Sequence, residues 1–226
     1  MEGHEGVVKI LLGRDGVDPN QLFEHGQSPL SWAASQKRKR VVKMLLRRGD
    51  VNPNKPNKDG QTPLWCAAKN RDGEVVEMLL GRGDVNPDTP NGYGQTPLWR
   101  AAMDGHEEMV KILLRQDSVN PNKPSQSGET SLFWAARRGH EGVVKLLLER
   151  DDIDPDKPNE DGQTPLWWAA KHGHKRVVKM LLGRGDVSPN KPDMYGQTPL
   201  FCAARRGHTG VVALLHSRAS AAPRTA

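Results

Sequence analysis

The stretch GQTPLWWAAKHGHKRVVKMLLGRGDVSPNKPDMY, residues 162–195, determines the fold class of this chain. Thr164 stands where a helix N-cap belongs and Pro165 at the first helical position, so a short helix is expected to begin there. Gly173 then interrupts the chain, and the paired valines and leucines of VVKMLL recur at the spacing of a second helix. The remaining residues, rich in Gly, Asp, Pro and Asn, predict an extended loop, which we call the finger.

The same arrangement recurs through the chain at a fixed period. Glycines that open the string G-[QE]-[TS]-[PS]-L stand 34 residues apart (60−26, 94−60 and so on), at Gly26, Gly60, Gly94, Gly128, Gly162 and Gly196. Two helices of about nine residues cannot bury their apolar faces alone, so each repeat must stack on its neighbours. The sequence therefore predicts an all-α solenoid of helix pairs with projecting finger loops.

The period also predicts the domain boundaries. Gly3 is in phase with Gly139 (139−3 = 136, four periods), so Met1 falls in an inter-helix turn and Val7 and Val8 would begin a second helix without its first. We expect either a fragment of a longer array or a face that meets something else, whereas the polar C-terminus is typical of a natural cap. The expected segments are an N-terminal half repeat (second helix and finger) at 1–25, repeats at 26–59, 60–93, 94–127, 128–161 and 162–195, a C-terminal capping repeat at 196–218 and a disordered tail at 219–226.

Composition limits the possible partners and compartments. The 33 lysines and arginines against 27 aspartates and glutamates give a net charge of +6, which permits an acidic partner without demanding nucleic acid. Two cysteines and the lack of a basic-then-apolar leader favour the cytoplasm, and the basic run Lys37–Arg40 keeps a nuclear location open. No apolar run approaches the 18 residues of a membrane span.

Each repeat resembles the ankyrin repeat, whose signature is T-P-L-H-x-A within about 33 residues. TPL, AA, GH, VVKxLL and DVN occur in the order of that family, and the 34-residue variant is similar to ankyrin arrays of fungal multidomain proteins. The resemblance implies a protein-binding scaffold in which helix pairs form a curved stack and fingers project from it. It also implies a protein without catalytic activity or cofactor.

Two departures from that family alter the expected contacts between repeats. The histidine that follows TPL is replaced, so aromatic stacking is expected in place of its hydrogen bonds; the residues are Ser31, Trp65, Trp99, Phe133, Trp167 and Phe201. Most fingers carry two prolines, such as Pro155 and Pro158, which remove backbone donors. Hairpin pairing in the fingers should therefore be weak.

Candidate binding residues lie in columns that vary from repeat to repeat. The positions after the alanine pair carry cations in the last three repeats, which predicts a positive stripe on the concave side, flanked by tryptophans and finger-tip tyrosines. The alternatives are that the charges only solvate an exposed helix face and that the tryptophans pack between repeats. The predicted partner-binding residues are Arg137, Arg138, Lys171, Arg205, Arg206, Trp134, Trp168, Tyr93 and Tyr195.

No pattern of residues predicts an enzyme. His106, His140, His174 and His208 recur at the period, which indicates a structural role in the inter-helix turn, and no third ligand accompanies them to hold a metal. Cys66 and Cys202 lie four repeats apart, beyond disulfide reach, and neither has the setting of a nucleophile.

We therefore expect a non-enzymatic protein–protein interaction module without cofactor or metal. It is expected to be a monomer or part of a longer array and to bind a protein partner through an acidic segment. Nucleic acid binding along the stripe and a purely structural spacer are the alternatives.

Overall fold

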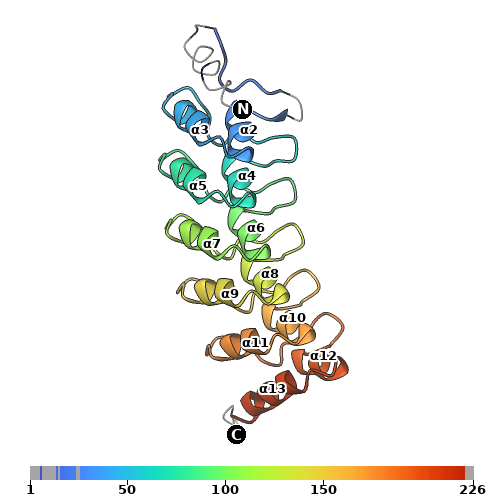
Figure 1. Cartoon of the computed structure of the whole chain (residues 1–226). Coiled ribbons are helices and arrows are strands. Elements are labelled where there is room, and N and C mark those ends of the chain that lie inside the picture. The colour runs from blue at the N-terminus through green and yellow to red at the C-terminus, as the bar shows by residue number, and fades with distance from the viewer. Residues whose placement is uncertain (1–5, 7–13, 15, 24–25, 222–226) are drawn as a thin grey trace. The chain divides into compact units, whose positions relative to one another are not determined.

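The computed structural model describes residues 6, 14, 16–23 and 26–221, and these residues form twelve helices and no strand (Figure 1). The first helices of the repeats are α2 (Pro29–Ser35), α4 (Pro63–Lys69), α6 (Pro97–Met103), α8 (Ser131–Arg138), α10 (Pro165–His172) and α12 (Pro199–Arg205). The second helices are α3 (Lys39–Leu46), α5 (Gly73–Leu80), α7 (Glu107–Leu114), α9 (Glu141–Leu148), α11 (Lys175–Leu182) and α13 (Thr209–Ala221). The predicted all-α solenoid of helix pairs is confirmed.

The chain forms two compact units, and the boundary between them runs through α6 and α7. Unit 1 comprises Met1–Arg100 and Ile112–Val119, and unit 2 comprises Ala101–Lys111 and Asn120–Ala226. Within unit 1, α2 packs on α4 and α3 packs on α5. Within unit 2, α8, α10 and α12 form one row and α9, α11 and α13 form a second row (Figure 1).

The first helices begin where the Ser-Pro and Thr-Pro pattern predicts. Thr164 is an extended N-cap whose hydroxyl accepts a hydrogen bond from the Trp167 amide, and Pro165 follows it. Thr62 caps α4 and Ser28 caps α2 in the same way. Each cap satisfies an amide that the helix leaves unpaired, which stabilises the helix start by about 1 kcal/mol.

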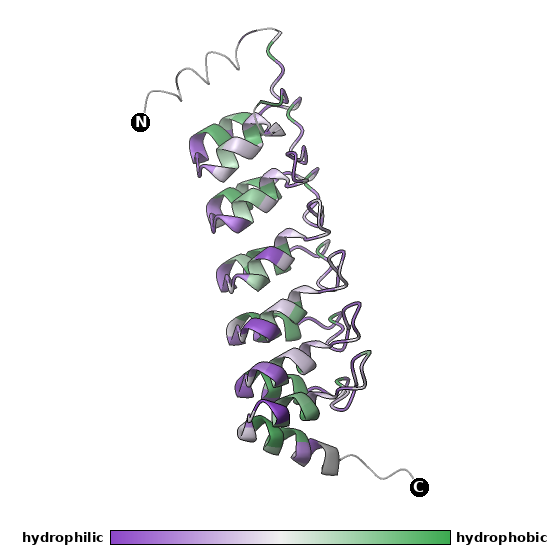
Figure 2. Ribbon diagram, turned by 90° about the vertical axis from the view of Figure 1, so that its right-hand side faces the viewer, coloured by the Kyte–Doolittle hydropathy of each residue, from purple (hydrophilic) through white to green (hydrophobic). Residues whose placement is uncertain are grey.

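The apolar core follows the leucine, alanine and valine columns. Leu132 and Leu166 of the first helices are completely buried, as are Val143, Val144 and Leu147 of α9. Figure 2 shows hydrophobic residues concentrated on the helices and hydrophilic residues along the fingers. The fingers therefore contribute little to the core.

The recurring Gly-His pair ties one inter-helix turn to the next. Gly139 adopts a left-handed φ of 74°, and the ring of His174 lies so close that a Cβ at residue 139 would come within 2.7 Å of it. Nε2 of His174 also lies 3.1 Å from the carbonyl oxygen of Arg137. His140 and His208 make the same contacts one repeat earlier and one repeat later, so the predicted structural role of these histidines is confirmed.

We expected hydrogen bonding between repeats to be lost where aromatic residues follow TPL, but two of the tryptophans at this position form such bonds. The indole Nε1 of Trp65 donates to the carbonyl of Gln95 at 3.1 Å, and that of Trp167 donates to Gln197 at 2.8 Å. Each bond spans 30 residues and joins a first helix to the following finger. Aromatic contact between repeats is also present, because Phe133 of this column meets Trp168 of the next repeat edge to face. The indole bonds were missed because an indole carries its own N–H donor on a ring large enough to reach the neighbouring backbone.

The fingers are held by turns and by asparagine side chains. A backbone bond from Asn159 to Gln163 closes one finger tip, and the absence of strands from the described residues agrees with weak hairpin pairing. Asn122 donates to the carbonyl of Asp152 in the next finger and accepts from the Asp154 amide. Asparagine side chains thus join neighbouring fingers within unit 2, a contact that the sequence analysis missed.

The expected half repeat at the N-terminus and the expected tail at the C-terminus have different outcomes. The predicted helix with Val7, Val8, Leu11 and Leu12 lies outside the described residues. At the other end, α13 continues to Ala221, three residues into the segment 219–226 that was expected to be a disordered tail. Alanine is the strongest helix former and the first helix breaker is Pro223, which explains the longer helix. Residues 222–226 lie outside the described residues.

Candidate binding surface

Cations and tryptophan rings alternate on the first-helix face of unit 2. The guanidinium carbon of Arg137 lies 4.5 Å from the ring centre of Trp134 and 4.1 Å from that of Trp168. The Lys171 ammonium lies 4.4 Å from the ring of Trp168 and 4.7 Å from that of Trp167. We call Trp134, Arg137, Trp167, Trp168 and Lys171 the cation–aromatic cluster.

The tryptophans of this cluster are fixed by contacts within and between repeats. Trp168 meets Phe133 of the preceding repeat edge to face, with ring centres 5.9 Å apart. Its indole Nε1 donates to the side chain of Gln163, and that of Trp134 donates to Glu129. Trp167 and Trp168 therefore pack between repeats, and Trp134 and Trp168 lie against the cations.

The positive charges of this face have few acidic neighbours. None of the ion pairs found in the described part of the chain includes any of the five predicted cations, Arg137, Arg138, Lys171, Arg205 and Arg206. Burial lowers the pKa of Arg137, and the negative charge of Glu129 partly offsets this lowering. Burial and the charge of Arg206 also lower the pKa of Lys171. The face thus carries positive charge that is incompletely solvated.

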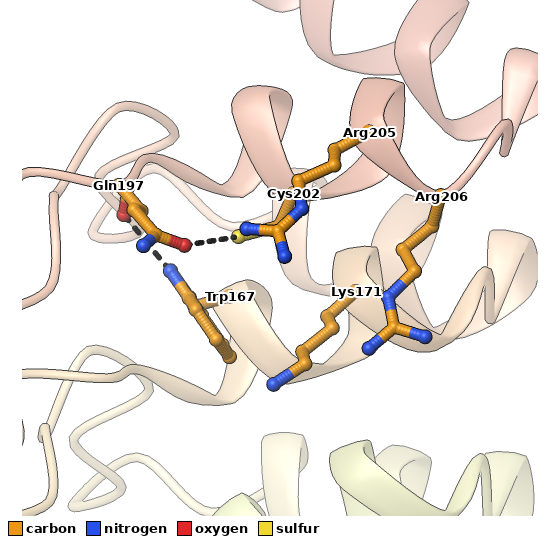
Figure 3. Close-up of a pocket in the computed structure, with 6 residues that line it drawn as sticks. All are labelled: Trp167, Lys171, Gln197, Cys202, Arg205 and Arg206. Atoms are coloured by element: carbon orange, nitrogen blue, oxygen red, sulfur yellow. Dashed lines mark hydrogen bonds between the residues drawn. The ribbon is translucent and has the colours of Figure 1, made fainter.

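A hollow opens between α10 and α12, beside the cluster (Figure 3). Lys171, Arg205 and Arg206 line it together with Trp167, Gln197 and Cys202. Gln197 accepts from Trp167 through its backbone carbonyl and from the Cys202 thiol through its side chain. The sequence analysis placed the three cations on one face but missed the hollow and Gln197.

The comparisons with known proteins agree with the helix-pair fold. A family model described as ankyrin repeats in three copies matches residues 1–90, 83–159 and 152–224. The chain belongs to the ankyrin repeat family. It is similar to the crystal structure of EF0377, an ankyrin repeat protein, with 30% identity, a TM-score of 0.78 and coverage of 86% of this chain and 98% of that one. No curated protein matches the chain.

Membership of the ankyrin family gives the chain a general class of function. Ankyrin repeats generally mediate protein–protein interaction, and the fold is typically a non-enzymatic interaction module. No helix in the described ranges is long and apolar enough to cross a membrane. Nor do these ranges contain a group of three or more side chains suited to hold a metal ion.

The two cysteines of this ankyrin array are not joined in a disulfide. Both are free and buried. Burial raises the pKa of Cys66 to about 11 and also raises the pKa of Cys202, so both remain thiols at neutral pH. A protonated thiol is a poor nucleophile, which agrees with the sequence analysis.

The two predicted finger-tip anchors are exposed but belong to different units. Tyr93 of unit 1 is 66% exposed, and Tyr195 of unit 2 is 70% exposed. Met194, next to Tyr195, and Phe201 on α12 are also exposed. The sequence analysis assigned Phe201 to stacking between repeats with the rest of its column, but Phe201 is exposed whereas Trp167 of that column is buried.

Proposed function

We propose that this ankyrin array binds an acidic segment of a protein partner on the face formed by α8, α10 and α12 of unit 2. The observation that carries the proposal is the cation–aromatic cluster, in which Arg137 lies against two indole rings. Arg138, Arg205 and Arg206 extend the positive charge at exposed positions. Tyr195 and Met194 add exposed apolar area at the neighbouring finger tip.

The arrangement favours recognition because its side chains are already ordered. A guanidinium held against two rings loses less conformational freedom on binding than a freely rotating one. Its incomplete solvation also makes a carboxylate partner more favourable than at a fully hydrated cation. Trp and Arg are the residues that most often dominate protein interfaces, while exposed cations mainly accelerate encounter.

The experiment uses two charge-reversal variants with equal net charge. The site variant carries Arg138→Glu, Arg205→Glu and Arg206→Glu, and the control carries Lys145→Glu, Lys175→Glu and Lys179→Glu on the second helices. All six residues are exposed, so both variants should fold, which circular dichroism checks. Proteins captured from lysate by the parent chain are mapped as overlapping peptides and tested for direct binding by fluorescence anisotropy.

We expect acidic peptides to bind the parent and the control variant, and to bind the site variant at least about tenfold more weakly. Equal binding by all three chains would overturn the proposal and leave the face as a solvated surface. Capture that is lost on nuclease treatment and falls steeply with salt would instead indicate nucleic acid.

A further inference from the structure

The hollow between α10 and α12 is lined by Cys202, which stands in a column of the repeat that holds tryptophan in the two preceding repeats. Trp134, Trp168 and Cys202 are 34 residues apart and occupy the same position of successive first helices. The two indoles support Arg137 and Lys171 through cation–π contacts. Cys202 is too short to do so, and no cation–π contact found in the described residues includes Arg205 or Arg206.

The groups that line this hollow are suited to an anion. Lys171, Arg205 and Arg206 supply three positive charges, and no carboxylate lines the hollow. The hollow is open to solvent on one side, and its cavity volume is about 70 Å³. Mutual repulsion among the cations contributes to the lowered pKa of Lys171. An anion bound there would relieve that repulsion.

The charge of the lining favours a dianion over a monoanion. A phosphate monoester carries a charge of about −1.5 to −2 at pH 7 and offers three strong acceptor oxygens. Arg guanidinium groups bind such oxygens through two parallel hydrogen bonds. A carboxylate brings one charge, and the phosphodiester of a nucleic acid brings one charge and no terminal group that can enter a small hollow.

We propose that the hollow lined by Trp167, Lys171, Gln197, Cys202, Arg205 and Arg206 binds the phosphate group of a phosphorylated side chain on a protein partner. This inference rests on the proposed function, because the phosphate arrives on the segment that crosses the cation–aromatic cluster. It adds a requirement that the proposed function does not contain, namely that phosphorylation of the partner strengthens binding.

The first experiment uses inorganic phosphate as the probe. The Trp167 indole N–H, which bonds to Gln197 at the edge of the hollow, reports binding through its ¹H–¹⁵N resonance. We expect phosphate to shift this resonance saturably at constant ionic strength and acetate not to do so. Arg206→Gln, at an exposed position, should weaken phosphate binding about tenfold, whereas the exposed control Lys179→Gln should leave it unchanged.

Cys202→Trp tests the hollow without removing any charge. The indole should fit because the same column accommodates Trp134 and Trp168, and it should support the arginines as those rings support Arg137. We expect the variant to lose the saturable phosphate shift. If it binds phosphate as tightly as the parent, the hollow is not the site and the inference is wrong.

The second experiment compares three versions of one acidic peptide, with serine, phosphoserine or glutamate at its centre. We expect the phosphoserine version to bind the parent about tenfold more tightly than the glutamate version, and Cys202→Trp to abolish that preference while retaining acidic binding. Equal binding of phosphoserine and glutamate versions overturns the inference and leaves the proposed function intact. A preference for an oligonucleotide over the phosphopeptide overturns both.

Discussion

The inter-helix turns differ between the two units although their helix pairs are built alike. In unit 2 the turns place glycine at a left-handed φ, as at Gly139 and Gly173 with φ of 74° and 75°. In unit 1 the same position holds Lys37 and Arg71, with φ of 55° and 57°. A side chain in this region costs roughly 1–2 kcal/mol, so unit 1 carries backbone strain that unit 2 avoids.

The residue after the turn enlarges this difference. In unit 2 it is a histidine whose ring lies on the turn glycine of the preceding repeat, as that of His174 lies on Gly139. In unit 1 it is Arg38 or Asp72, and one buried carboxylate oxygen of Asp72 has no hydrogen-bond partner. The helix pair therefore tolerates two kinds of turn, which are linked to the neighbouring repeat by a histidine in unit 2 and by an asparagine amide in unit 1. We expect unit 1 to open more readily than unit 2.

The first-helix faces of the two units also differ. In unit 1, Asn70 donates to the carbonyl of Ser35 and so joins two neighbouring turns. In unit 2 the corresponding positions are Asp104, Arg138, His172 and Arg206. The same scaffold therefore presents an amide that serves the fold in one unit and charged or titratable groups in the other.

The largest effect is expected from a charge placed in the core of one unit. Leu132 in unit 2 is completely buried, and Leu132→Asp loses its packing and buries an unpaired charge, a cost of about 4 kcal/mol or more. We expect α8 to α12 to lose protection from amide hydrogen exchange while α2 to α5 keep theirs, because stability in repeat proteins is set by nearest neighbours.

The reciprocal variant is Leu64→Asp in unit 1, where Leu64 is equally inaccessible. In this variant α2 to α5 should lose their protection from amide hydrogen exchange, while α9 to α13 should keep theirs. A single sharp unfolding transition in either variant, unchanged from the parent, would contradict the separate response of the two units.

An intermediate effect is expected from exchanging the two kinds of turn. Gly173→Ala combines a left-handed alanine with a Cβ only 2.6 Å from the His208 ring, and should destabilise by about 2–4 kcal/mol. In the opposite direction, Lys37→Gly should raise the free energy of unfolding by up to about 1 kcal/mol. The relief of backbone strain in the folded chain should exceed the free energy that the unfolded chain gains from the greater freedom of glycine. Urea unfolding gives both free energies.

Gly207→Ala is the matched control for this exchange. Gly207 has φ of 74°, yet an added Cβ would meet nothing within 4 Å, so only the backbone cost of about 1–2 kcal/mol remains. Equal losses for the alanines at 173 and 207 would show that the histidine contact contributes nothing.

The fold could be predicted because its determinants recur at one period. The helix start at Thr164, the turn at Gly173 and the buried column of Leu132 and Leu166 all depend on local sequence, and the structure has each as expected. The period also predicted that Trp134 and Trp168 lie beside the stripe, and both contact Arg137. That these residues bind a partner stays a prediction.

The missed features depend on side chains that meet across repeats. The bond from the Trp167 indole to the Gln197 backbone requires a ring orientation that spacing alone does not determine. The hollow beside it is lined by side chains from two repeats, among them Cys202, which stands in the column that holds Trp134 and Trp168 in the two preceding repeats. The available signal was the change from tryptophan to cysteine at the 34-residue period.

The smallest effect concerns the pH dependence of unit 2. The His172 ring stacks on Trp168 with centres 5.4 Å apart and on His174 with centres 5.9 Å apart. Burial, followed by the proximity of His174 and the charges of Arg137 and Lys171, lowers the pKa of His172 below its usual 6.5. The unfolded chain therefore takes up this proton more readily than the folded chain.

Protonation of His172 thus penalises folding only below its ordinary pKa, so stability should be unaffected above about pH 7 and fall as the pH drops through 6.5 toward 5. The effect should be small because His172 is exposed. We would measure urea unfolding at pH 7.5 and 5.5 for the parent and for His172→Gln, which keeps a polar side chain but cannot titrate. The variant should lose less stability than the parent over this pH range. An identical loss would mean that His172 takes up its proton as readily when folded as when unfolded, and the neighbouring cations would then not act on it as the structure indicates. In unit 1, where Gln36 and Asn70 occupy the same column, no such change is expected from this position.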